Sequence, residues 1–312
     1  MRVPGSPADP RPLPAVGPAG LPRPRDTRAV AAPVPAAPVA VVTGAGRGLG
    51  RAIADRLAQG GYRLVLGDID GSAVRETAAA LAPHHLAPHH LALEADVTRP
   101  DSADALATAA VSRFGRLDVW VNNAGVVPLG PFGELTDDEL AYACGVNLTG
   151  VMHGCRAALA RMRPRHRGHI VNIASLVAVK PLAGLAAYSA TKAGVLALSD
   201  GLRRELRGRD IHITTVLPYM ADTPAAAGLR PRLLPALRPE HVADAVAQVI
   251  RHPRPRVFVP RAGRLLSWMT LAPQWAQDLA DRLLKVDEIA LRADSTARSR
   301  YDAELHRRAG AR

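Results

Sequence analysis

The stretch "VAVVTGAGRGLG", from Val39 to Gly50, constrains the fold more than any other part of this chain of 312 residues. A short run of apolar, mostly β-branched residues is typical of a buried strand, and it is followed at once by glycines and a helical pattern. Glycine permits a sharp turn, and it lets a pyrophosphate approach the N-terminus of the next helix. The stretch therefore predicts a strand, a phosphate loop and a helix that bind a dinucleotide, with loop contacts from Gly44, Arg47, Gly48, Leu49 and Gly50.

Apolar runs and helical patterns alternate along the rest of the chain as far as residue 260. The predicted strands are Val39–Thr43, Arg63–Gly67, Leu91–Ala95, Leu117–Asn122, His169–Ala174, Ile211–Leu217 and Val257–Val259. The predicted helices lie at 49–59, 72–81, 101–114, 136–162, 187–207 and 239–251. Short apolar strands separated by helices indicate a parallel sheet covered on both faces. Right-handed crossovers then give the α/β class, with a doubly wound parallel sheet of the Rossmann type.

The two ends of the chain differ from this middle. Residues 1–38 hold 11 of the 27 prolines and no periodic apolar pattern, which predicts a disordered leader. Residues 39–260 form the predicted dinucleotide-binding catalytic domain. Residues 261–312 form a predicted helical extension, in which 265–284 show helical spacing of leucines and tryptophans and 293–312 are expected to be a frayed helix or tail.

The net charge of +12 is concentrated at the ends. Residues 1–38 hold five arginines and two acids, and residues 251–312 hold twelve arginines, one lysine and seven acids. The middle is nearly balanced and has no basic run interleaved with aromatics, so we expect no nucleic-acid partner. Two cysteines and the lack of an apolar run near ~20 residues favour a reducing, cytoplasmic setting.

A tandem repeat, "APHHLAPHHL", covers residues 82–91. Its four histidines have no Asp, Glu or Cys beside them to complete a metal site. We interpret it as a duplication in a loop, and we predict no functional metal.

Asp68 bears most directly on the choice of cofactor. It ends the second strand, about 20 residues past the loop, where an acid accepts from the ribose hydroxyls and repels a 2′-phosphate. NAD is therefore favoured, although Arg47 in the loop keeps NADP open. Further contacts are expected from Asp96 and Val97 after the third strand, with Asp96 accepting from adenine, and from Asn123, Ala124 and Gly125 after the fourth.

With its motifs in this order, the chain is similar to the short-chain dehydrogenase/reductase family from about Val39 to Val259. The motifs are "TGAGRGLG", "DV" at 96–97, "NNAG", "VN" at 146–147, Ser175 and "YSATK" at 188–192. The resemblance implies catalytic roles for Asn147, Ser175, Tyr188 and Lys192. It also implies that Ser175 hydrogen-bonds the substrate oxygen and that Asn147 holds a water linked to Lys192.

The spacing of Tyr188 and Lys192 has a physical rationale beside that resemblance. Residues at i and i+4 share one face of a helix. A phenol can give or take the proton that accompanies hydride transfer, but its free pKa of ~10 is high for a base. A nearby ammonium is expected to lower that pKa, and Lys192 can also hold a ribose.

One departure from the family pattern follows the sixth predicted strand. Pro218 and Thr223 match and are expected to contact the cofactor, but Tyr219 replaces a glycine. Its side chain either crowds the nicotinamide carboxamide or points into the substrate pocket. A nucleotide-binding scaffold without turnover therefore stays as an alternative.

The substrate side is less specific. Residues 224–238 are apolar with interspersed arginines, which suits an apolar alcohol or carbonyl substrate with a polar or acidic end. An NADPH-dependent biosynthetic ketoreductase is the second hypothesis for the function. Residues 261–285 are interpreted as a helical flap beside the pocket or on a partner subunit, as a peripheral membrane contact, or as completion of the core. The resemblance implies a homodimer or homotetramer.

Overall fold

A computed structural model describes residues 37–81, 90–229, 231, 235–286 and 288–311. Nearly all of the predicted leader and most of the histidine repeat lie outside the described residues. The described residues form one compact unit, which starts at Ala37.

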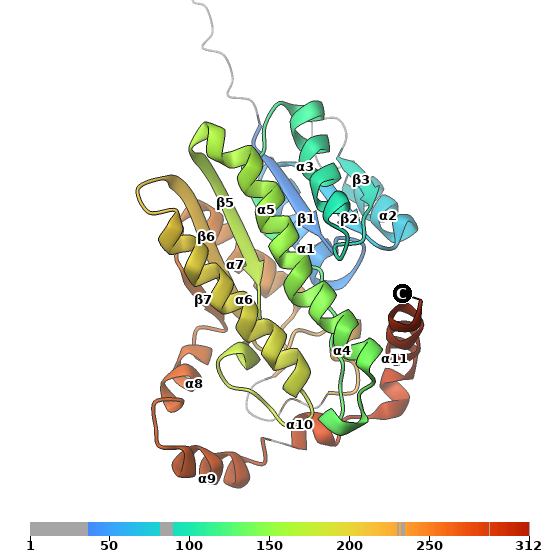
Figure 1. Cartoon of the computed structure of the whole chain (residues 1–312), viewed down its shortest axis with the longest axis vertical. Coiled ribbons are helices and arrows are strands. Elements are labelled where there is room, and N and C mark those ends of the chain that lie inside the picture. The colour runs from blue at the N-terminus through green and yellow to red at the C-terminus, as the bar shows by residue number, and fades with distance from the viewer. Residues whose placement is uncertain (1–36, 82–89, 230, 232–234, 287, 312) are drawn as a thin grey trace, which may run out of the picture. The chain divides into compact units, whose positions relative to one another are not determined.

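Seven parallel strands form the sheet in the described part of the chain, in the order β3-β2-β1-β4-β5-β6-β7 (Figure 1). Each strand lies where the sequence predicts one, and the doubly wound parallel fold is confirmed. The strand order reverses between β1 and β4, and a crevice forms at such a point, beyond the carboxyl ends of the strands. The strands are β1 Val39–Thr43, β2 Arg63–Asp68, β3 Leu91–Glu94, β4 Val119–Asn122, β5 Arg167–Ile173, β6 Asp210–Pro218 and β7 Arg256–Val259.

Helices cover both faces of the sheet because successive strand residues point to opposite faces. Val39 and Val41 of β1 pack into the core under α3, α5 and α6, whereas Ala40 and Val42 pack into the core under α1, α2 and α7. These helices are α1 Gly48–Gln59, α2 Gly71–Leu81, α3 Pro100–Phe114, α5 Gly150–Met162, α6 Ala186–Glu205 and α7 Pro239–Arg251.

The helix predicted over 136–162 contains a break in its hydrogen-bond pattern. Helix α4, Asp137–Cys144, leads into a π-helical turn, Gly145–Thr149, and α5 follows directly. A π turn accommodates one extra residue and often marks a functional position. Asn147 lies in this turn and is fully buried.

The C-terminal region is helical to its last turn. It comprises α8 Gly263–Met269, α9 Gln274–Leu284, α10 Glu288–Leu291 and α11 Ser295–Gly310. The expectation of a frayed helix or tail over 293–312 is wrong for α11. Asp294 caps this helix by accepting from the backbone N–H groups of Thr296 and Ala297, and Arg298, Leu305 and Ala309 are buried. Its order depends on contacts with residues distant in sequence, which local composition does not reveal.

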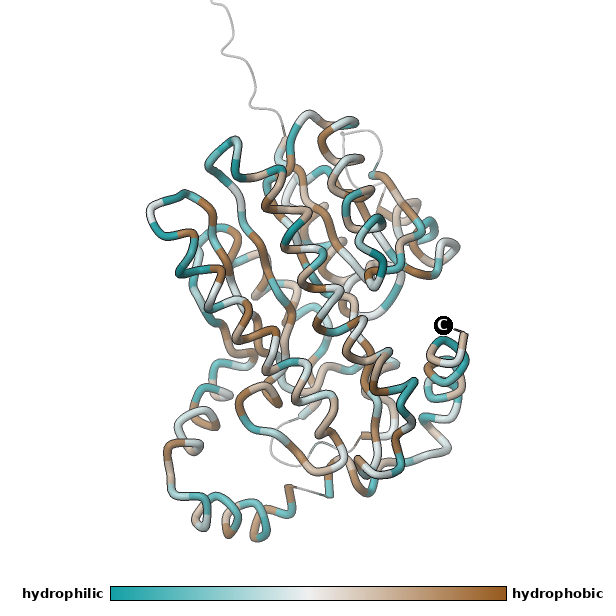
Figure 2. Tube along the Cα trace, in the orientation of Figure 1, coloured by the Kyte–Doolittle hydropathy of each residue, from teal (hydrophilic) through white to brown (hydrophobic). Residues whose placement is uncertain are grey.

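Helices α8 and α9 form an arm that follows β7 and lies below the sheet in Figure 1. Apolar and polar residues alternate along α9, as Figure 2 shows by colour. Most of the large apolar side chains of the α8–α9 arm do not complete the core, because they are exposed. They are Leu265, Trp268, Leu271, Trp275, Leu279, Leu283 and Leu284. In the described part of the chain, no helix combines the length and apolarity that a membrane span needs.

Candidate active site

A cavity of about 310 Å³ lies at the carboxyl ends of the strands. It is where a doubly wound sheet binds its ligand. Ser175, Tyr188 and Lys192 line it, and Asn147 does not. All residues predicted to contact the cofactor line it as well: Gly44, Arg47, Gly48, Leu49, Gly50, Asp68, Asp96, Val97, Asn123, Ala124, Gly125, Pro218 and Thr223.

The glycine loop after β1 has no room for side chains at two of its positions. A Cβ on Gly50 would lie 1.9 Å from the carbonyl oxygen of Gly44. Gly44 has a φ of 66°, and a Cβ there would lie 2.8 Å from Ala124 Cα. The Asn123 side chain holds the loop by donating to the carbonyls of Thr43 and Gly44, at 2.9 and 3.1 Å. The loop thus presents its backbone at the N-terminus of α1, a geometry that fits a pyrophosphate.

Asp68 joins this loop to the end of β2. Its Oδ2 accepts from the backbone N–H of Gly46 at 2.9 Å, and its Oδ1 accepts from that of Asp70 at the same distance. A carboxylate has about four acceptor positions, so it retains capacity for ribose hydroxyls while it fixes the loop.

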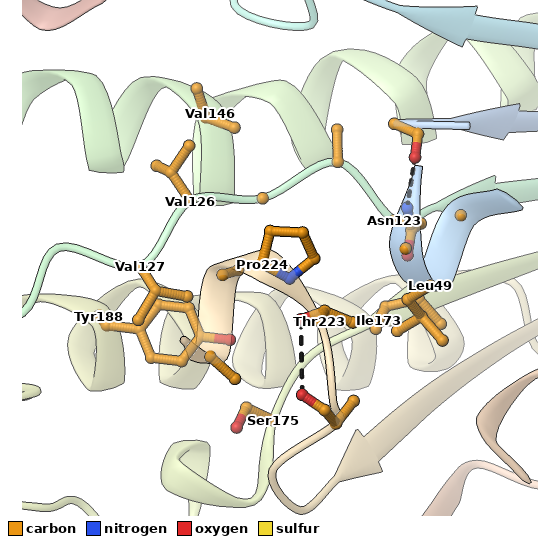
Figure 3. Close-up of a pocket in the computed structure, with 18 of the residues that line it drawn as sticks. Leu49, Asn123, Val126, Val127, Val146, Ile173, Ser175, Tyr188, Thr223 and Pro224 are labelled. Carbon is orange, nitrogen blue, oxygen red and sulfur yellow. Dashed lines mark hydrogen bonds between the residues drawn. The ribbon is translucent and has the colours of Figure 1, made fainter. Parts of the chain in front are cut away.

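Tyr188 and Ser175 come from different elements. Tyr188 lies in the first turn of α6, and Ser175 follows β5. Figure 3 shows the Tyr188 ring beside Val127, with its hydroxyl directed into the space that Ser175 and Pro224 border. Burial raises the pKa of the Tyr188 hydroxyl well above its usual range, and a hydrogen bond with Ser175 offsets part of that rise. The expected net lowering of this pKa is therefore not found: burial has the largest effect, and the nearby Tyr301 raises the pKa further.

Lys192 is buried in the cavity wall. Its Nζ donates to the carbonyl oxygen of Ile173 at 3.0 Å and lies 5.7 Å from the centre of the Tyr188 ring. Burial lowers the pKa of Lys192 to about 8, since a charged ammonium loses hydration there. The lysine remains mostly charged at neutral pH.

Asn147 fixes the loop after β4 from the π turn. Its Oδ1 accepts from the backbone N–H of Val126, and its Nδ2 donates to the Val126 carbonyl, both at 2.8 Å. Nδ2 also reaches Thr191 Oγ1 at 3.2 Å. An added Cβ on Gly125 would meet both Asn147 Oδ1 and Lys192 Nζ, at 3.2 and 3.5 Å, so the two side chains border the same small space.

Tyr219 lies between two cavities. It lines the main cavity and a second one of about 50 Å³, whose walls include Leu266, Met269 and Leu284 of the α8–α9 arm. Part of the arm therefore packs beside the pocket. Thr223 lines the main cavity, with its hydroxyl 3.4 Å from the carbonyl oxygen of Ala221.

Helix α11 adds cavity residues that no sequence motif indicated. Tyr301, Glu304, Leu305 and Arg308 all line the cavity. Tyr301 accepts at its hydroxyl from the Val127 N–H at 2.9 Å. The acid cap at Asp294 was a signal for the helix, but nothing in the sequence indicated which surface the helix covers.

Arg298 fastens α11 to the loops around the cavity. This side chain is only 2% exposed, and it donates to the carbonyl of Ala225 at 2.9 Å and to that of Val127. It also pairs with Asp302 at 2.8 Å. One guanidinium thus links three segments of the chain.

A parallel sheet with a glycine loop, and a Ser-Tyr-Lys set at its carboxyl edge, define a nucleotide-dependent oxidoreductase class of site. The family model for short chain dehydrogenases matches residues 38–233. The chain belongs to the short-chain dehydrogenase family. It is 34% identical over 255 residues to a probable oxidoreductase, EphD, of Mycobacterium tuberculosis, an alignment that covers 75% of this chain and 43% of EphD. The chain thus spans less than half the length of this curated relative.

Solved structures agree with this assignment. A short-chain dehydrogenase/reductase from Burkholderia phymatum, solved in complex with NAD, matches with a TM-score of 0.65 and 30% identity, over 71% of this chain and 88% of its own. An actinorhodin polyketide ketoreductase solved with NADPH matches with a TM-score of 0.67 and 30% identity, over 72% and 95% of the two chains. These likenesses support a nicotinamide cofactor here and do not choose between its two forms.

Proposed function

We propose that this chain is an NAD(H)-preferring oxidoreductase that interconverts an alcohol and a ketone or aldehyde on a mostly apolar substrate. The observation that carries the proposal is the convergence of Ser175, Tyr188 and Lys192 on one cavity that Asp68 also lines. The proton-transfer groups and the ribose-binding acid thus share a single space. We expect one bound dinucleotide to reach both.

The glycine loop fits such a cofactor, because Gly44 and Gly50 pack too closely against the protein to carry a Cβ and so form a tight turn at the N-terminus of α1, where a pyrophosphate can bind. Asp68 would hold the adenosine ribose, Asp96 and Val97 the adenine, and Lys192 the second ribose. Asn123, Ala124 and Gly125 would allow close passage, and Pro218 and Thr223 would border the nicotinamide. Bound there, the dinucleotide would supply or accept the hydride.

Tyr188 is the proposed general acid and base. Because burial keeps its pKa high, the phenol is protonated at neutral pH and is ready to donate to a carbonyl oxygen. Ser175 would donate a second hydrogen bond to the same oxygen and stabilise the charge that develops there. In the oxidation of an alcohol Tyr188 would act as the base, and Lys192 would favour loss of the proton from the phenol. Asn147 would order the space beside Lys192 for a proton path.

The cavity walls support an apolar substrate. They include many apolar side chains: Val126, Val127, Leu176, Val177, Leu182, Leu185, Met220, Leu229 and Ile289. Burial of such a substrate contributes about 25 cal/mol per Å² of apolar surface, so larger apolar alcohols should bind better than small polyols.

Two further contacts are proposed for the whole protein. The exposed apolar residues of α8 and α9, with Arg264 and Arg282 beside them, favour a peripheral contact with an anionic membrane. The family resemblance favours a homodimer or homotetramer. We also propose a cytoplasmic location.

The decisive experiment is a side-by-side fluorescence titration with NADH and NADPH, followed by turnover assays on a panel of alcohols and ketones. Tighter binding of NADH, with turnover of apolar substrates, is expected. Tighter NADPH binding, with carbonyl reduction only, would favour the biosynthetic ketoreductase. Binding without turnover of any substrate would favour the scaffold.

A further inference from the structure

Helix α11 places a carboxylate between two arginines at the end of the cavity where Asp68 lies. Glu304 Oε1 lies 3.2 Å from a terminal nitrogen of Arg47, and the same oxygen pairs with Arg308, one helical turn further along α11. Glu304 and both arginines line the cavity. One end of the proposed dinucleotide site is therefore formed by a helix outside the region that matches the family model.

Arg47 is the basic residue of the glycine loop, and it is the reason why the sequence leaves NADP as an alternative cofactor. In the structure it interacts with Glu304 of α11, with Asp68 at the end of β2 and with Asp70 just after that strand. Burial acts to lower its pKa, but the hydrogen bond with Glu304, and the charges of Glu304, Asp68 and Asp70, together raise that pKa above its usual value. The charged guanidinium is thus already paired with a carboxylate before any ligand binds.

The pair Arg47 and Arg308 around one carboxylate resembles a site for a phosphate. Guanidinium groups bind carboxylates and phosphates through the same forked N–H geometry. A phosphate on the adenosine ribose would need these donors, and it would meet the negative charges of Glu304 and Asp68 as well. Glu304 already makes the contacts that such a phosphate would otherwise make.

We propose that Glu304 is a specificity-determining residue that excludes the 2′-phosphate of NADP by occupying Arg47 and Arg308. The inference rests on the proposed function, since it needs the dinucleotide to bind with its adenosine ribose beside Asp68. It assigns to α11 a role in cofactor selection that is independent of the catalytic residues.

The helix is held by contacts other than Glu304, so a substitution there changes charge with little effect on position. Arg298 and Tyr301 bond to loops beside the cavity, and Leu305 and Ala309 are buried. Glu304 itself is a quarter exposed, at 26% of its side chain. A neutral amide at this position removes the charge and leaves those anchors in place.

The test is the dissociation constant of NADH and of NADPH for wild-type protein, Glu304→Gln and Glu205→Gln. Glu205 is exposed at the end of α6, near the opposite edge of the sheet, and its substitution removes the same charge. We expect the ratio of the NADPH constant to the NADH constant to fall at least about tenfold in Glu304→Gln, since charge-assisted hydrogen bonds are released to the phosphate. The ratio should stay within about twofold of wild type in Glu205→Gln.

An unchanged ratio in Glu304→Gln, or an equal loss of affinity for both nucleotides, would overturn the inference. A second exchange, Arg47→Ala in the Glu304→Gln background, should abolish the gain. If the Gln variant does not fold, Glu304→Ala removes the same carboxylate and takes its place. Wild-type protein that binds neither nucleotide would refute the proposed function instead. Wild-type protein that prefers NADPH would refute both the NAD preference and the role of Glu304, because the carboxylate would then not exclude the 2′-phosphate.

Discussion

The ammonium of Lys192 lies 5.7 Å from the centre of the Tyr188 ring, and both side chains are buried in the same cavity wall. Burial affects the two groups differently at neutral pH. It favours the neutral, protonated form of the phenol, whereas it destabilises the charged form of the lysine. This pairing leads to separate expectations for chemistry and for stability.

Replacing Tyr188 by phenylalanine should lower kcat by about 100- to 10 000-fold, because the proton donor is lost from the reacting oxygen. NADH affinity should stay within a few-fold of wild type, since the ring and its packing are kept. Steady-state kinetics and a fluorescence titration measure the two effects. Tyr62→Phe, at a tyrosine that does not line the cavity, is the control. Turnover near the wild-type value would refute the assignment of Tyr188.

Replacing Lys192 by methionine should abolish turnover and yet stabilise the fold at pH 7. The pKa of Lys192 is lowered from 10.5 to about 8 by burial, so folding disfavours its protonated form. The penalty is fully present below pH 8, and it disappears as pH rises from 8 toward 10.5, where the unfolded chain also loses its proton. After about 1 kcal/mol for the lost bond to Ile173, the variant should gain about 2 kcal/mol.

Urea unfolding at pH 7 and at pH 10 checks this expectation. The advantage of Lys192→Met should shrink or vanish at the higher pH. A variant that is less stable than wild type at both values would show that the buried ammonium is compensated by its surroundings. In that case the lysine would carry no stability penalty.

Arg298→Lys should loosen α11 and raise KM about tenfold with a smaller effect on kcat. Lysine keeps the charge but lacks the planar fork that reaches the carbonyls of Ala225 and Val127 together. Arg300→Lys, on the exposed side of the same helix, is the matched control and should be silent. Equal kinetics for the two variants would argue against a role for Arg298 in shaping the cavity.

Tyr219→Ala should connect the main cavity with the smaller one beneath the α8–α9 arm. Apolar substrates with longer chains should then gain in kcat/KM relative to short ones, by about fourfold for each additional buried methylene. The fold should lose about 3 kcal/mol, because a large side chain is removed from a packed site. Tyr219→Phe, which keeps the ring, should leave the chain-length profile unchanged. A uniform fall for all substrates would place Tyr219 against the cofactor rather than the substrate.

The α8–α9 arm should bind anionic vesicles. Co-sedimentation of wild-type protein should be lost when Leu271, Trp275 and Leu279 are all replaced by serine, because these side chains are exposed and supply the apolar face. Phe132→Ser, at an exposed aromatic elsewhere, is the control. Wild-type protein that stays in the supernatant would refute the membrane contact. A change in oligomeric state in the triple variant would then assign the arm to a second copy of the chain.

The sheet was predictable because its signals are local. The first strand, Val39–Thr43, matches its predicted bounds. The glycines that follow it indicate a turn directly from the sequence. The π turn at Asn147 was not predictable. The residues on both sides of it favour an ordinary helix, and the extra residue is held by side-chain bonds to Val126.

Burial and long-range contacts account for the rest. The pKa of Tyr188 depends on how much water the fold removes, which no spacing of residues reports. The position of α11 depends on Arg298, which reaches a carbonyl 171 residues earlier in the chain. Residues 293–312 are polar and rich in arginine, so they are expected to be a tail until that buried arginine is seen.

The last turn of α11 has a practical consequence for labelling experiments. Gly310 is the last residue of this helix, and Arg308, two positions earlier, lines the cavity. A fluorescent label attached at residue 310 would therefore lie within one helical turn of the proposed nucleotide site. Such a label would report on ligand binding through its immediate surroundings. It would also disturb that binding, so affinities measured on labelled protein should be compared with those of unlabelled protein.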